Sequence, residues 1–139
     1  MKKFGNFSNL FVGLLLLMAG LYFLYSKGII FADFESVEPA AAYEMIKKDP
    51  DIVILDVRTE REYRQDGRLK GAKLIPLQEL EERLDELESY KKGPILVYCR
   101  SGHRSAKASR LLAERGFRPI NIRGGIIGWK DAALPTAKE

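Results

Sequence analysis

Apolar and polar residues follow two different patterns in this chain of 139 residues, with the change near position 33. Residues 4–26 carry no charge, and nearly every side chain from Leu10 to Tyr25 is apolar. From Phe34 onward, short apolar runs alternate with longer segments in which apolar residues recur at helical spacing. The pattern predicts an apolar N-terminal helix followed by one α/β domain, because about 110 residues is near the usual size of a domain.

Strands and helices are expected to alternate through the domain. The runs at 52–55 and 95–98 are continuously apolar, which is typical of parallel strands buried on both faces. Strands are expected at 34–37, 52–55, 72–75, 95–98 and 119–122, and helices at 40–48, 60–65, 78–90, 105–115 and around Trp129. This order predicts an open, mostly parallel β-sheet flanked by helices on both faces. Ligands of such sheets bind beyond the carboxyl ends of the strands.

The segment 78–90 has the strongest helical pattern in the domain. Leucines recur at spacings of three and four from Leu77 to Leu87, and acidic residues occupy the other positions. This pattern predicts one amphipathic α-helix that packs its leucines on the sheet. A coiled-coil contact with a partner is the alternative, but the segment is short for one.

The charge-free N-terminal segment is long enough to cross a membrane. At about 1.5 Å per helical residue it reaches roughly 35 Å, against a hydrocarbon core of about 30 Å. We therefore expect a membrane anchor over 1–27, with residues 4–26 in the bilayer, a linker over 28–33 and a domain over 34–139. A cleaved signal peptide and a buried core helix are the alternatives. Cleavage after Ala32 would place the bulky Ile30 at the −3 position, so Ile30-Phe31-Ala32 is not a convincing cleavage site.

The positions of the basic residues predict the orientation of this anchor. Lys2 and Lys3 precede the segment and only Lys27 follows it closely, so the N-terminus is expected in the cytoplasm and the domain on the exported side. All 19 acidic residues lie from Asp33 onward, which leaves the domain nearly neutral despite the net charge of +4. No basic run is interleaved with aromatic residues, so nucleic-acid binding is not expected. One cysteine and one histidine are too few for a cysteine-rich zinc site, and no metal or cofactor is expected.

The only cysteine follows the expected strand 95–98 and precedes an expected helix. A loop between a strand and a helix can turn backbone N–H groups inward, and a helix N-terminus adds partial positive charge. Such surroundings favour a thiolate, which is the nucleophilic form of cysteine. The alternative for the cysteine is a buried structural role. For the basic residues of the loop, the alternative is a solvent-facing position without a chemical role. The candidate catalytic residue is Cys99, and the candidate substrate-binding residues are Arg100, Ser101, Gly102, His103, Arg104 and Ser105.

The segment Cys99–Ser105 resembles the active-site loop of the rhodanese family of thiosulfate sulfurtransferases. Two further stretches are similar to motifs of this family. One runs from Asp56-Val57-Arg58 through Glu62-Tyr63 to Ile75-Pro76, and the other contains Gly124-Gly125 and Gly128-Trp129. The resemblance covers residues 34–134, nearly the whole expected domain. The sequence departs from it at Arg68 and Leu69, where the family often has histidine and isoleucine.

The resemblance implies a two-step transfer of sulfur through a persulfide on Cys99. The donor would be thiosulfate or a similar small anion, the acceptor would be cyanide or a thiol, and the basic loop residues would attract the anionic donor. Asp56 and Arg58 would support the loop, or would form a structural ion pair.

Two other functions remain open. The first is a slow sulfur carrier or a regulatory module with the same fold. The second is a cysteine-dependent phosphatase, although those enzymes have a Cys-x5-Arg loop and this chain has Cys-x4-Arg.

Overall fold

The computed structural model describes residues 5–26 and 33–138, which fall into two compact units, Met1–Ala32 and Asp33–Glu139. The first unit contains helix α1, Gly5–Ser26, of 22 residues. In the part of the chain that the structure describes, no helix meets the length and hydropathy of a membrane span. The predicted anchor is therefore not supported, and the predicted orientation of the chain stays a prediction. Most of the predicted linker, 28–32, lies outside the described residues.

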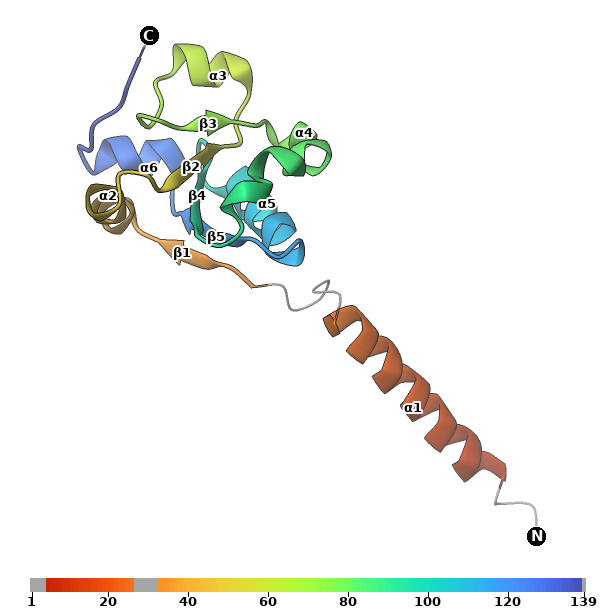
Figure 1. The fold of residues 1–139 in the computed structure, drawn as a ribbon. Coiled ribbons are helices and arrows are strands. Elements are labelled where there is room, and N and C mark those ends of the chain that lie inside the picture. Colours follow the sequence, from red (N-terminus) through yellow and green to blue (C-terminus); the bar gives the residue numbers. More distant parts are fainter. Residues whose placement is uncertain (1–4, 27–32, 139) are drawn as a thin grey trace. The chain divides into compact units, whose positions relative to one another are not determined.

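The second unit is built on a five-stranded sheet in which every pair of neighbouring strands is parallel (Figure 1). The strand order is β1-β5-β4-β2-β3. The strands are β1 Glu35–Val37, β2 Val53–Asp56, β3 Lys73–Leu74, β4 Pro94–Tyr98 and β5 Arg118–Ile122. The predicted open parallel sheet is confirmed, and its central strand is β4.

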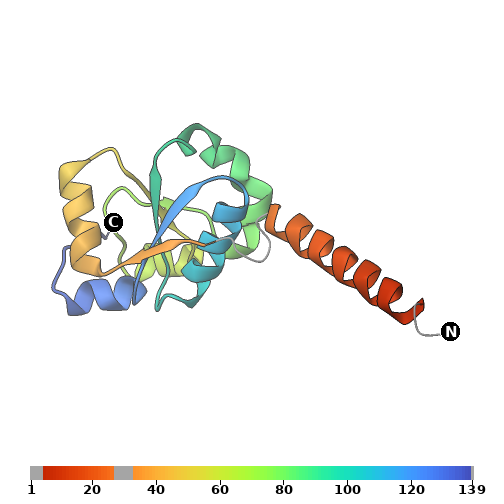
Figure 2. The same cartoon turned by 90° about the horizontal axis from the view of Figure 1, so that it is seen from below.

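Helices cover both faces of the sheet, as its alternating side chains require (Figures 1 and 2). The helices of the domain are α2 Pro39–Lys48, α3 Glu60–Gln65, α4 Leu77–Leu80, η1 Glu81–Tyr90, α5 His103–Glu114 and α6 Gly125–Asp131. One core cluster joins Leu55 and Val97 to residues of α4, η1 and α5. The other joins Ile54 and Leu96 to residues of α2 and α6. Neighbouring residues of β2 and β4 thus point into opposite cores.

The segment 78–90 is not the single α-helix that its leucines predict. One α-helical turn, α4, continues into the 3-10 helix η1, and the backbone departs from helical geometry at Arg83 (φ −113°, ψ 18°). Leu80 and Leu87 are nevertheless fully buried, as expected. The spacing of the leucines did not reveal the kink, because both helix types place residues three positions apart on nearby faces.

The register of the central strands brings the candidate residues to one edge of the sheet. Tyr98, the last residue of β4, lies opposite Asp56, the last residue of β2. Val97 lies opposite Asn121, near the end of β5. The segments after these three strands therefore meet at the carboxyl edge of the sheet, where ligands of parallel sheets bind.

Candidate active site

Cys99 follows the last residue of β4 and is almost fully buried, with 1% of its surface exposed. The loop after it is short, because α5 begins at His103, two residues earlier than the pattern predicts. Gly102 is the N-cap of α5 and has a φ of 111°, in the left-handed region that favours glycine. This conformation lets the chain turn from the strand into the helix within three residues, Arg100 to Gly102.

The Cys99 sulfur forms hydrogen bonds with the turn and with the first turn of α5. The backbone N–H of Gly102 donates to Sγ at 3.0 Å. The Cys99 thiol donates to the Ser105 hydroxyl oxygen at 3.4 Å, and that hydroxyl donates in turn to the Gly102 carbonyl at 3.2 Å. Donors aimed at one atom stabilise a negative charge on that atom.

These hydrogen bonds and burial shift the pKa of Cys99 in opposite directions. Burial raises the pKa of the thiol, because it removes water from the thiolate. The pKa of Cys99 is nevertheless held below its ordinary value, because hydrogen bonds outweigh burial. They involve the Ser105 side chain and the backbone N–H groups of Ser105, Gly102 and Ser101. The loop therefore favours the nucleophilic form of the cysteine.

Helix α6 fixes the first two peptides of the loop from outside. The Ile126 N–H donates to the Cys99 carbonyl at 2.9 Å, and the Ile127 N–H donates to the Arg100 carbonyl at 3.1 Å. The loop carbonyls thus satisfy N–H groups of the first turn of α6 that have no partner within the helix. Gly125 lies at this contact, where a Cβ atom would overlap the carbonyl oxygens of Cys99 and Arg100.

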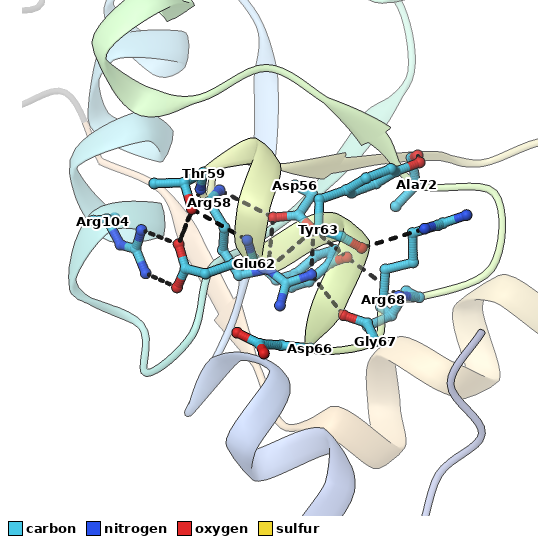
Figure 3. Close-up of polar contacts among 12 residues, drawn as sticks. Asp56, Arg58, Thr59, Glu62, Tyr63, Asp66, Gly67, Arg68, Ala72 and Arg104 are labelled. Atoms are coloured by element: carbon cyan, nitrogen blue, oxygen red, sulfur yellow. Dashed lines mark hydrogen bonds and ion pairs between the residues drawn. The ribbon is translucent and has the colours of Figure 1, made fainter. Parts of the chain in front are cut away.

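Arg104 connects the loop to α3 (Figure 3). Its two terminal nitrogens donate to the two carboxylate oxygens of Glu62 at 2.8 and 2.7 Å. Glu62 is also part of a capping box with Thr59, and its pKa is lowered to about 2, first of all by the Arg104 hydrogen bond. Arg104 is therefore held in place by a protein carboxylate, and its predicted contact with substrate stays a prediction.

Asp56 and Arg58 form a buried ion pair beside the loop (Figure 3). Arg58 Nη2 donates to Asp56 Oδ2 at 2.7 Å and to the Gly67 carbonyl at 2.8 Å. The Tyr98 hydroxyl donates to the same Asp56 oxygen at 2.7 Å and accepts from the Leu69 N–H at 3.2 Å. The pair thus joins β2 and β4 to residues 67–69. Burial, and next the Asp56 charge, raise the pKa of Tyr98, so its hydroxyl stays a donor.

Two pockets open beside the loop, and Arg100 and Asp66 line both of them. The first, of about 390 Å³, lies against α6 and is lined by Arg58, Gln65, Asp66, Arg100, Ile126, Ile127, Lys130 and Lys138. The second, of about 640 Å³, lies against α3. Arg100, Ser101 and His103 are exposed, while Ser105 is fully buried.

Three contributions to the site were missing from the candidate residues. The role of Glu62 has a sequence signal, because Thr59-x-x-Glu62 is a capping-box pattern, but the pattern does not reveal its second partner. The contact of α6 with the loop and the placement of Lys138 depend on tertiary structure and have no local signal. Among residues 5–26 and 33–138, no cluster of three or more His, Cys, Asp or Glu side chains could hold a metal.

The rhodanese-like domain family matches residues 38–132, from the end of β1 through α6. The chain belongs to the rhodanese family. It is 35% identical over 107 residues to the thiosulfate sulfurtransferase GlpE of Coxiella burnetii, covering 75% of this chain and 94% of that protein. It is 36% identical over 84 residues to the thiosulfate sulfurtransferase PspE of Escherichia coli, covering 60% of this chain and 77% of that protein.

A solved rhodanese-related structure from Thermoplasma volcanium has the same fold. It superposes with a TM-score of 0.69 at 32% identity and covers 76% of this chain and 100% of that chain. The rhodanese fold and the place of this chain in a sulfurtransferase family are thus confirmed.

Proposed function

We propose that this rhodanese is a thiosulfate sulfurtransferase that carries sulfur as a persulfide on Cys99. The observation that carries the proposal is the set of hydrogen bonds at Sγ, which accepts from the Gly102 N–H at 3.0 Å and lies 3.4 Å from the Ser105 hydroxyl oxygen. They lower the pKa of a cysteine that burial alone would keep as a thiol. The relatives named thiosulfate sulfurtransferases add support for the donor.

In the first step the Cys99 thiolate attacks the outer sulfur of thiosulfate. A bond forms between the Cys99 sulfur and that outer sulfur, and the S–S bond of thiosulfate breaks, so that sulfite leaves with the bonding electron pair. The exposed guanidinium of Arg100 attracts the dianion and offsets the charge of the leaving sulfite. The loop N–H groups then hold the charge of the persulfide.

In the second step a nucleophilic acceptor attacks the outer sulfur of the persulfide. Cyanide gives thiocyanate and a thiolate gives a new persulfide, and in both cases Cys99 returns as a thiolate. The lowered pKa of Cys99 favours this step as well, because a thiolate of low basicity leaves more readily. One environment therefore serves both halves of the reaction.

The direct experiment supplies the full-length chain, in a mild non-ionic detergent, with thiosulfate and cyanide and follows thiocyanate. Cys99→Ser removes the nucleophile, so thiocyanate formation should fall to the rate without protein. Lys107→Ala is the control, because it changes an exposed residue of α5 outside the candidate site and leaves the sulfur in place. Turnover that persists in Cys99→Ser would contradict the proposed nucleophile.

The alternatives give different results in the same samples. If wild-type protein gains one sulfur atom at Cys99 by mass spectrometry but forms no thiocyanate, the protein is a persulfide carrier. If Cys99 gains no sulfur, the protein has either a binding role or phosphatase activity. Hydrolysis of p-nitrophenyl phosphate distinguishes these two. Release of p-nitrophenol that depends on Cys99 would replace the sulfurtransferase proposal.

A further inference from the structure

The pocket of about 390 Å³ beside the loop is larger than the proposed sulfur donor requires. At about 30 Å³ for each water-sized group, a five-atom dianion such as thiosulfate occupies no more than about 150 Å³. Pockets for small organic molecules are about 300–1,000 Å³. We call this pocket the α6 pocket; its volume suits an organic ligand.

The charges of the α6 pocket favour an anionic ligand. Arg58, Arg100, Lys130 and Lys138 line it together with one carboxylate, that of Asp66. Arg58 is occupied by the buried Asp56, and the Lys130 ammonium donates to the Asp66 carbonyl at 2.7 Å. The exposed Arg100 and Lys138 are therefore the cations best placed to pair with a ligand. Ile126 and the partly exposed Ile127 provide an apolar wall.

The C-terminal segment places Lys138 in this pocket. Ala137 exchanges two backbone hydrogen bonds with Arg68, at 3.0 and 2.7 Å, and the Trp129 indole donates to the Pro135 carbonyl at 2.8 Å. Lys138 follows directly after this anchored segment. It lies beyond residues 38–132, which the rhodanese family matches, so it is a feature that the match to the family does not explain.

The α6 pocket adjoins the backbone of the loop that begins at Cys99. The N–H groups of Ile126 and Ile127, which line it, bind the carbonyls of Cys99 and Arg100. A ligand between Ile127 and Arg100 would thus lie beside the residue that follows Cys99.

We propose that the α6 pocket binds a carboxylate-bearing organic thiol, the sulfur acceptor, with Arg100 and Lys138 pairing with its carboxylate. This inference rests on the proposed sulfurtransfer through Cys99. The acceptor thiolate attacks the outer sulfur, a new S–S bond forms, and the persulfide bond breaks. The Cys99 thiolate then leaves with the electron pair, and no oxidant or reductant is consumed.

The test loads the full-length chain with thiosulfate, removes excess donor and measures discharge by two matched thiols, N-acetylcysteine and N-acetylcysteine amide. They differ in a carboxylate, and rates are compared per thiolate. Wild type should prefer N-acetylcysteine by about three- to tenfold, because cations beside a pocket raise the local concentration of anions. The preference should shrink in 1 M salt, where the screening length is about 3 Å.

Lys138→Ala should remove most of the preference without changing the rate with the amide, and Lys138→Arg should keep it. Lys92→Ala is the control, because this exposed lysine follows η1 and precedes β4, at the edge of the sheet opposite Cys99. A sulfur-loaded wild type without preference would overturn the acceptor pocket and leave sulfurtransfer intact. The acceptor pocket would also be overturned if Lys138→Ala changed only the rate at which thiosulfate loads sulfur onto Cys99. Failure to load Cys99 would count against the proposed function instead.

Discussion

Ser105 is the side chain that contacts the Cys99 sulfur, and Ser109 lies one turn further along the same helix. The Ser105 hydroxyl lies 3.4 Å from Sγ, whereas among the described residues the buried Ser109 hydroxyl has no hydrogen-bond partner. Comparing variants at the two serines therefore separates the effect of a hydroxyl at the sulfur from the effect of a hydroxyl buried elsewhere in α5.

We expect Ser105→Ala to raise the pKa of Cys99 by about half to one unit, because one hydrogen bond to the thiolate is worth about 1 kcal/mol. The rate of alkylation by iodoacetamide, measured from pH 5 to 10, reports this pKa. Ser109→Ala should leave the profile unchanged. Equal shifts in the two variants would show that burial, and not the Ser105 donor, sets the ionisation.

The Glu62 carboxylate holds Arg104 and caps α3 at the same time. Its pKa is about 2 in the folded protein, against an ordinary value of 4.5, so its contribution to stability is complete above pH 4.5. The contribution is lost as the pH falls from 4.5 to about 2, because protonation then breaks the pair with Arg104.

Glu62→Gln should lower the free energy of unfolding by about 1–2 kcal/mol at pH 7, and the difference from wild type should vanish as the pH falls toward 2. Urea unfolding at several pH values measures both effects. Glu60→Gln is the matched control on α3, since its ion pair with Arg64 is mostly exposed and should contribute little. A difference that persists at pH 2 would mean that the ion pair is not its cause.

At the scale of elements, the contact between α6 and the loop allows no side chain at Gly125. This residue has a φ of 56°, and a Cβ atom would overlap the backbone of Cys99 and Arg100, which cannot move away as a flexible side chain can. The loop must therefore shift if the residue is enlarged.

We expect Gly125→Ala to lower the free energy of unfolding by more than about 2 kcal/mol and to reduce thiocyanate formation at least tenfold. Gly93→Ala is the control, because a Cβ there meets no atom within 4 Å. Thermal unfolding and the steady-state assay give the two readouts. Full activity in Gly125→Ala would show that the loop tolerates displacement.

For the molecule as a whole, the network around Asp56 links strands that are distant in sequence to the C-terminal segment. Tyr98 joins β4 to Asp56 of β2 and to Leu69, and the adjacent Arg68 pairs with Ala137. The network is a structural connection, because the hydrogen bonds of Asp56, Arg58 and Tyr98 run to one another and to the backbone of residues 67 and 69.

Tyr98→Phe should therefore lower the free energy of unfolding by about 1–3 kcal/mol, since it leaves Asp56 and the Leu69 N–H with one partner fewer. The pH profile of Cys99 alkylation should not change. Tyr90→Phe, at a side chain that is 41% exposed, is the control. A changed alkylation profile in Tyr98→Phe would assign the network a direct role in ionising the thiol.

The sequence was informative where one short segment determines the structure. The apolar runs predict the strands, and the segment Val97–Ser105 predicts a nucleophilic Cys99 at the end of a strand; the structure confirms its place directly after β4. The kink at Arg83 and the early start of α5 at His103 were missed, because small backbone changes leave the apolar pattern unchanged. The pairing of Arg104 with Glu62, 42 positions apart, depends on the fold and could not be predicted from spacing.

The burial of Cys99 has a consequence for which atom of the persulfide reacts. Cys99 is 1% exposed, whereas in the proposed persulfide the added sulfur would be bonded about 2 Å from Sγ, at the length of an S–S bond. Attack on the inner sulfur would leave a mixed disulfide on the protein and expel hydrosulfide, whereas attack on the outer sulfur completes the transfer. In the proposed reaction, steric shielding of Sγ would thus direct the acceptor to the outer sulfur and protect the cysteine from dead-end disulfides.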